Sequence, residues 1–357
     1  MHSRNHTHGQ TMFVYCVSFV LGLFLYFNCD DCYKGWWIAL EQYSTLSRHI
    51  YEPTSAYYAE SLLVPFLAKL FNANPTREAF NALSGFLTLA ILPLLAAGLL
   101  ARLHKLSSVI AILCIYAGSF LYLRSFWLGY PDPLTIILLN CAALSIRPVR
   151  VFFCVLLAGL AHFSLTAAST ISLMALYFAA SSIPGSVRPR LIAAGGLGLV
   201  VGKLLLKLWY YVFSYKLEDR IDFVAQGSMA GLFKGIWHFY EVYTREVAAF
   251  WATPGWLFIA VVLLLLVFFA LKRRLLFCLA FLAAIAIAYA VRFITTDGLR
   301  DFATTVSAAY VLALCEFFQA WQPRHGAAQW LPPPIAPDHG TPAMPGQATR
   351  TLPCSMP

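Results

Sequence analysis

The chain has 357 residues, of which 60% are hydrophobic and 11% are charged. Because an ordinary soluble domain carries roughly 25% charged residues, this composition excludes a soluble globular enzyme. It also excludes a disordered chain, which needs low hydrophobicity and high charge, and a disulfide-rich secreted module, which is shorter and denser in cysteine. A polytopic membrane protein remains, so we predict an all-α transmembrane helical bundle.

The net charge of +9 does not indicate a nucleic-acid partner. Lysines and arginines occur singly or in twos and threes between apolar segments, and no basic domain is present that could line a nucleic-acid groove. We therefore expect a membrane lipid partner and no nucleic acid.

Apolar runs along the chain predict about ten membrane spans, since a bilayer core about 30 Å thick needs about 20 apolar residues per helix. The first run lacks a small-x-small cleavage site, which indicates a retained helix rather than a secretory signal. The stretch 149–183 is too long for one span and contains polar residues, so we predict two short helices there. The predicted spans are 11–28, 79–101, 106–123, 129–146, 149–165, 166–183, 191–213, 252–271, 275–291 and 302–319.

Basic residues gather in every second connection between these runs, which predicts the orientation of the bundle. The four basic clusters are Arg102/Lys105, Arg147/Arg150, Arg188/Arg190 and Lys272/Arg273/Arg274. Placing them in the cytoplasm puts both termini inside and the connections 29–78, 124–130, 214–251 and 292–301 outside. The short loops and the absence of a targeting extension favour a bacterial inner (plasma) membrane.

Two segments outside the predicted spans have a distinct composition. The first external connection is acidic and aromatic over 29–60, which predicts an interfacial, partly helical loop. Its continuation over 61–71 is too short to span, and we expect Pro65 to break it, so that it dips into the membrane or lies along the surface. Residues 322–357 are rich in proline and glycine, which predicts a disordered cytoplasmic tail after a membrane domain over 1–321.

Asp30 and Asp31 directly follow the first predicted span and are the candidate catalytic residues. A carboxylate at this position could accept a proton from a substrate hydroxyl or hold a divalent cation. The alternative is a solvated acidic loop. Cys29 and Cys32 flank the pair, a spacing that suits a disulfide, a redox pair or half of a metal site, although no second Cys/His pair is present nearby to complete a zinc site.

Three arginines, Arg124, Arg292 and Arg300, fall in the predicted external connections, against the usual bias. Arginines at helix ends can hold a phosphate through two hydrogen bonds. Carboxylates stand nearby in the sequence, including Asp132 and Asp301, so the alternative is local ion pairing.

Lys203 and Lys207 lie four residues apart within the seventh predicted span, where a charge is costly and marks a polar cavity by default. The alternative is snorkelling to the interface, which explains Lys207 more easily than Lys203. His162 lies at mid-membrane, where hydrogen bonding across helices is more common than catalysis. Nearby glycines follow no strand and favour close helix packing over a nucleotide loop: Gly195, Gly196, Gly198 and Gly202.

These features resemble the polytopic glycosyltransferases of the GT-C class, which use polyprenyl-phosphate sugars. The resemblance rests on Asp30/Asp31, on Tyr58-Ala-Glu60-Ser-Leu-Leu-Val-Pro65 and on Gly129-Tyr-Pro-Asp132-Pro. It implies that Asp30 or Asp31 acts as the base and that basic residues hold the carrier phosphate. The expected substrate contacts are Glu60, Arg124, Asp132, Lys203, Lys207, Arg292 and Arg300. No metal ligand is assigned. The resemblance leaves open whether a divalent cation is required as a cofactor.

Three other functions stay open. A secondary transporter or flippase would line a substrate path with Lys203, Lys207 and His162. An enzyme that polymerises or ligates lipid-linked oligosaccharide would share the external arginines and differ in its donor. A membrane accessory protein without chemistry would use the proline-rich tail to dock a partner.

Overall fold

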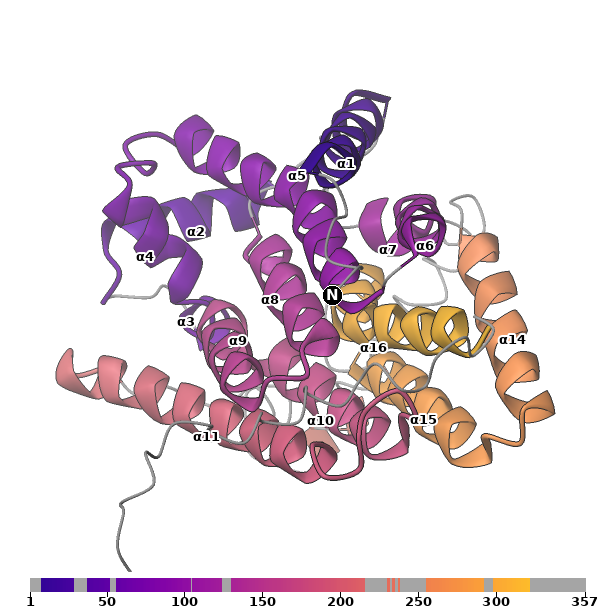
Figure 1. Ribbon diagram of the computed structural model, residues 1–357. Helices are drawn as coiled ribbons and strands as arrows, with labels where there is room; N and C mark the ends of the chain where they lie inside the picture. The colour runs from indigo at the N-terminus through magenta and orange to yellow at the C-terminus, as the bar shows by residue number, and fades with distance from the viewer. Residues whose placement is uncertain are drawn as a thin grey trace, which may run out of the picture. The chain divides into compact units, whose positions relative to one another are not determined.

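The computed structural model describes residues 8–28, 37–51, 56–103, 105–123, 130–215, 255–291 and 298–321, with five isolated residues between 230 and 237. All regular secondary structure in these ranges is helical, which agrees with the predicted all-α class (Figure 1). The chain divides into two compact units, Met1–Ala320 and Trp321–Pro357. The first unit contains all of the helices described below, except for the last residue of α16.

Each predicted apolar run contains a helix, and four of these helices are long and apolar enough to cross a membrane. The four are Gly9–Asn28, Arg77–Arg102, Arg188–Val212 and Leu299–Trp321, and the other six apolar helices have 10–17 residues. These helices are consistent with an integral membrane protein. The ten are α1 (His8–Asn28), α5 (Arg77–Arg102), α6 (Leu106–Ala117), α8 (Asp132–Leu144), α9 (Pro148–Ala161), α10 (Phe163–Ala179), α11 (Arg188–Val212), α14 (Gly255–Leu271), α15 (Leu275–Val291) and α16 (Gly298–Trp321).

The long apolar stretch 149–183 forms two helices as predicted, but the break lies earlier than the sequence indicated. His162 has extended backbone angles (φ −159°, ψ 98°) and separates α9 from α10. The Phe163 N–H donates to the backbone oxygen of Glu60 (3.2 Å), which lies in another part of the chain. A tertiary contact therefore anchors the break, and the polar residues 164–170 lie inside α10.

The first connection is partly helical, as predicted, with α2 (Trp37–Arg48), α3 (Ala56–Ala59) and α4 (Leu63–Leu70). The expectation that Pro65 breaks this segment was wrong. Pro65 lies in the first turn of α4, where a proline's missing N–H leaves no hydrogen bond unmade. A small buried core joins α2 and α4 to the start of α5 and to Tyr130: Leu40, Tyr43, Leu46, Val64, Ala68, Phe80 and Tyr130.

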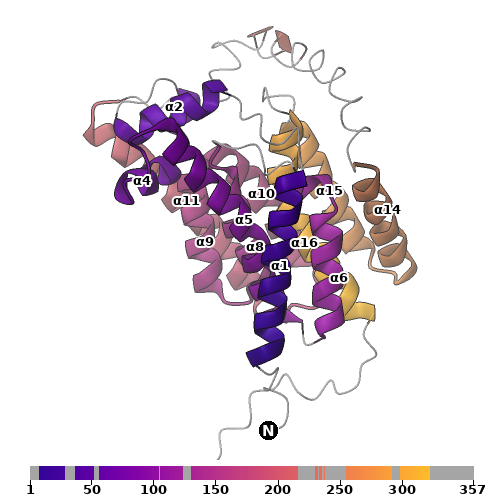
Figure 2. The same ribbon diagram turned by 90° about the horizontal axis from the view of Figure 1, so that it is seen from above.

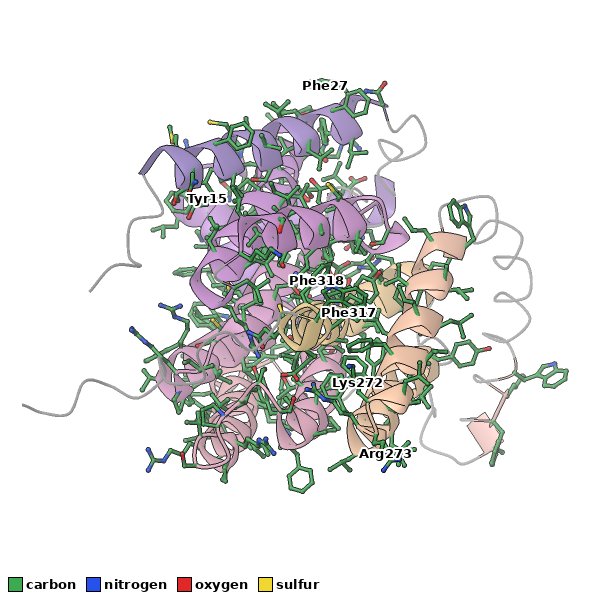
Figure 3. All side chains as sticks on the ribbon, turned by 45° about the vertical axis from the view of Figure 1, so that its right-hand side comes forward. Tyr15, Phe27, Lys272, Arg273, Phe317 and Phe318 are labelled. Carbon is green, nitrogen blue, oxygen red and sulfur yellow. The ribbon has the colours of Figure 1, made fainter. Side chains whose placement is uncertain are left out.

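Of the four long apolar helices, α16 is the most deeply buried, and every residue from Leu299 to Glu316 is buried. Hydrogen bonds or ring contacts join it to α6, α8, α10 and α14, and Figures 1 and 2 show it among these helices and α15. In contrast, α1 exposes large apolar side chains, and Phe27 on α1 points away from the other helices (Figure 3). Apolar outer helices thus surround a central helix that carries polar residues.

The four basic connections lie at one end of the bundle, which we call the basic end. Arg102 donates to the Ala143 carbonyl (2.7 Å) and to the Ser182 hydroxyl (3.0 Å). Arg274 pairs with Glu316 of α16 (3.3 Å). Beside them, Lys272 lies over the Phe268 ring, which packs against Phe317 at 4.5 Å (Figure 3). The basic clusters therefore share one end, and its cytoplasmic location stays a prediction.

Candidate functional site

A charged cluster is buried at the end of α16 opposite the basic end. Arg300, in the first turn of α16, pairs with Asp132 at the start of α8 and with Asp301 at 2.9 Å. All three side chains are 3% exposed or less. The guanidinium carbon lies 3.7 Å from the centre of the Tyr130 ring, within the range of a cation–π contact. In the described part of the chain, the cluster therefore combines one guanidinium, two carboxylates and one aromatic face.

Local sequence explains how the two helices present these groups. Pro131 and Pro133 flank Asp132 and favour the start of a helix there, and a carboxylate in the first turn is stabilised by the helix dipole. Arg300 lies in the first turn of α16, where the dipole disfavours a cation. Its two carboxylate contacts offset that effect, and removing one partner of such a buried pair costs about 3–5 kcal/mol.

The position of Arg300 matches the ion pairing that the sequence left open as an alternative to phosphate binding. Asp301 is its neighbour in the sequence, whereas Asp132 lies in a different helix. Arg300 and Asp132, both expected substrate contacts, are thus brought together.

An aromatic chain joins this cluster to the first connection. The Tyr130 ring lies 6.0 Å from that of Tyr43 on α2, and Tyr43 lies 5.0 Å from Tyr58 on α3. The Tyr43 hydroxyl donates to the Ser61 hydroxyl (3.4 Å), next to Glu60. The helices that follow the candidate acidic pair in the sequence therefore contact the buried charges through tyrosines.

Glu60 lies at the break between α9 and α10. Its side chain is buried and accepts a hydrogen bond from the Ser164 hydroxyl, while its backbone oxygen accepts from Phe163. Lys203 is half-buried, with its amine 4.3 Å from the centre of the Phe163 ring. Glu60 thus contacts the first two residues of α10, and Lys203 contacts the first of them.

Lys207 does not share this environment. Its side chain is exposed, and its neighbours Leu204, Leu208 and Tyr211 are exposed as well. This position agrees with the snorkelling alternative for Lys207. His162 is fully buried at the α9–α10 break.

Further candidate residues lie outside the described residues: Asp30, Asp31, Arg124, Arg292, Cys29 and Cys32. Within the described ranges, no group of three His, Cys, Asp or Glu side chains could hold a metal ion.

Sequence reasoning missed two groups of buried polar residues. Glu316 accepts hydrogen bonds from the backbone N–H groups of Ser181 (3.2 Å) and Ser182 (3.0 Å). Its single acidic side chain in an apolar run was a signal that could have identified it. The second group is the Tyr116 hydroxyl with Ser307 (2.7 Å) and Asn140, for which the sequence carried no clear signal.

Comparisons of the chain with protein-family models, with curated proteins and with solved structures found no match.

Proposed function

We propose that this chain is a glycosyltransferase of the bacterial inner membrane that transfers a sugar from a polyprenyl-phosphate carrier to an acceptor on the outer face. The observation that carries the proposal is the buried cluster of Arg300, Asp132 and Asp301 and its tyrosine connection to α2. Such a folded first connection, packed against buried charges and preceded by an acidic pair, supports chemistry at this end.

The proposed reaction is a single displacement. An acceptor hydroxyl attacks the anomeric carbon of the carrier-linked sugar, a new carbon–oxygen bond forms, and the bond from that carbon to the phosphate oxygen breaks. The acceptor proton passes to Asp30 or Asp31, and polyprenyl phosphate leaves. A cation near the phosphate stabilises the charge that develops on the leaving group.

Lys203 is the described residue best suited to be that cation. Arg300 is already engaged by two carboxylates, whereas the Lys203 amine contacts an aromatic ring and is only half-buried. Its amine lies over the ring of Phe163, whose N–H donates to the Glu60 backbone oxygen, so Lys203 and Glu60 both lie at the α9–α10 break. Lys207, which is exposed, would contact the carrier at the lipid boundary.

Lipid analysis tests carrier binding. The protein is purified in mild detergent, and its co-purifying lipids are identified by mass spectrometry for the wild type, for Lys203→Gln and for Lys272→Gln. Lys272 is an exposed lysine at the basic end, so its replacement is a matched control. We expect a polyprenyl phosphate in the wild type and in Lys272→Gln, with a clear loss in Lys203→Gln. Ordinary phospholipids alone, equal in all samples, would refute the proposal.

Product analysis tests the chemistry. Purified protein is incubated with a labelled pool of polyprenyl-phosphate sugars, and release of free polyprenyl phosphate is measured. Replacing both Asp30 and Asp31 by Asn should lower the rate by about 100-fold or more, the usual contribution of a general base. If the double variant is produced at the wild-type level and keeps full activity, Asp30 and Asp31 take no part in the reaction.

A second candidate function, secondary transport, is favoured by the character of α16. This helix, buried from Leu299 to Glu316, has charged residues near both ends, Arg300 and Glu316, about 24 Å apart at 1.5 Å per residue. Buried charges and hydroxyls along one helix suit a polar path across a membrane. Net movement of an anionic substrate into proteoliposomes, with no new covalent product, would favour transport over sugar transfer.

A further inference from the structure

Helices α10 and α16 run side by side in the same direction, and two sets of contacts fix their register. The Ser169 hydroxyl donates to the Thr305 carbonyl (2.9 Å). Just beyond the end of α10 at Ala179, toward the basic end, Ser181 and Ser182 donate to the Glu316 carboxylate. The spacing is 12 residues from 169 to 181 and 11 residues from 305 to 316, so the two segments keep nearly the same register over this length.

From this register we expect four polar side chains to lie on facing sides of the two helices, which we call the hydroxyl seam: Thr166 and Thr170 of α10 with Asp301 and Thr305 of α16. Each pair is four residues apart and so shares a face of its helix. Three residues before Ser169, Thr166 is level with residue 302, one residue from Asp301. Thr170 is level with residue 306, one residue from Thr305. All four side chains are 1% exposed or less.

Four oxygens of the seam lack partners within the described part of the chain, whereas Asp301 Oδ1 pairs with Arg300. The hydroxyls of Thr166, Thr170 and Thr305 and the Oδ2 atom of Asp301 are buried and make no hydrogen bond there. A threonine inside a helix ordinarily donates to its own helix four residues back, as Thr88 does to Ser84 at 3.0 Å. Buried polar groups in folded proteins are almost always paired, so several orphaned oxygens in one place indicate a bound ligand.

We propose that the hydroxyl seam binds a sodium ion. The orphaned groups are all oxygens, which are the preferred ligands of hard cations. Asp301 is paired with Arg300, which also pairs with Asp132, so the three groups carry a net charge of −1, and this low charge suits a monovalent ion better than a divalent one. The α9–α10 break at His162, one turn before Thr166, adds non-helical backbone, a feature of ion sites inside membranes. The inference concerns binding and is independent of which reaction the protein performs.

Sodium titration of the purified full-length chain in detergent tests the site. Thermal unfolding is followed while NaCl replaces choline chloride at constant ionic strength, and bound ²²Na⁺ is counted in parallel. We expect the melting temperature to rise saturably with sodium. Losing one hydroxyl ligand should weaken binding roughly 10- to 100-fold, so Thr305→Val should need that much more sodium for half-saturation.

Two further variants make the result decisive. Thr88→Val removes a buried threonine hydroxyl on α5, and it should leave the sodium dependence unchanged. Thr166→Val repeats the test on the other helix and serves if Thr305→Val does not fold. The proposal is overturned if choline and sodium raise the melting temperature equally. It is also overturned if a change of pH without sodium raises the melting temperature as much as sodium does. Equal weakening of sodium binding by Thr88→Val and by the seam variants would overturn it as well.

Discussion

The packing of α11 against α9 allows a sharp prediction, because two glycines of α11 have different surroundings. A Cβ atom built at Gly198 would lie 2.6 Å from the Phe152 carbonyl oxygen and 3.2 Å from the Val155 Cβ. One built at Gly196 would meet only the Met174 Cε, at 3.9 Å. The first contact is with the backbone of α9, which cannot move without shifting the helix, and the second is with a flexible side-chain end.

The expected free energies follow from this geometry. Replacing glycine by alanine inside a helix is favourable by about 0.8–1 kcal/mol, and this gain is common to both sites. Overpacking at Gly198 adds a cost of about 1–3 kcal/mol, whereas Gly196 has room for a methyl group. Gly198→Ala should therefore have a free energy of unfolding about 1–3 kcal/mol below that of Gly196→Ala.

The measurement is equilibrium unfolding in mixed micelles, with SDS as denaturant and tryptophan fluorescence as the signal. Both variants carry the same change of residue type on the same helix, so the difference between them isolates the contact with α9. Equal stabilities for the two variants would refute the inference that Gly198 is required for close packing of α9 and α11.

Three other predictions concern the buried polar groups and the orientation. Glu316→Gln should lower the free energy of unfolding by about 1–3 kcal/mol, because buried N–H groups lose a charged acceptor. Arg274→Gln should cost less, since the Arg274 side chain is 26% exposed, and the reverse order would contradict this account. Tyr116→Phe should cost about 1 kcal/mol in the same assay by removing a buried hydroxyl, and a stabilised variant would be the opposite of our expectation. In cysteine-free protein in intact cells, an impermeant maleimide should label Leu70→Cys on α4 and spare Lys272→Cys, and the inverse pattern would reverse the predicted orientation.

The helices could be predicted from sequence largely because the membrane demands long apolar runs, whose positions need no tertiary information. Helix ends were harder to place, since they depend on distant contacts. The break at His162 is anchored by Glu60, which is about 100 residues away in sequence. The prediction that Pro65 breaks its segment was wrong because the effect of a proline depends on where the helix begins. Helix α4 begins two residues before Pro65.

The site was predictable to the extent that its chemistry was local. Asp301 follows Arg300 directly, so their pairing could be expected, whereas the contact of Arg300 with Asp132 depends on how α8 and α16 pack. Helical spacing placed Lys203 and Lys207 on one face, but α10 covers only the first of them. Helix α11 therefore holds one lysine against the bundle and leaves the other exposed.

The charged cluster allows a test of whether this end of α16 serves more than stability. Replacing a complete buried ion pair with apolar residues is often neutral or favourable by about 1–4 kcal/mol, whereas removing one member costs about 3–5 kcal/mol. Arg300→Met alone should therefore be strongly destabilised, because Asp132 and Asp301 lose their shared partner. The triple variant with Asp132→Leu and Asp301→Leu should be more stable than Arg300→Met in SDS unfolding, yet inactive in sugar transfer. A triple variant that is less stable than the single one would mean that the cluster holds the bundle together, and its presence would then need no functional explanation.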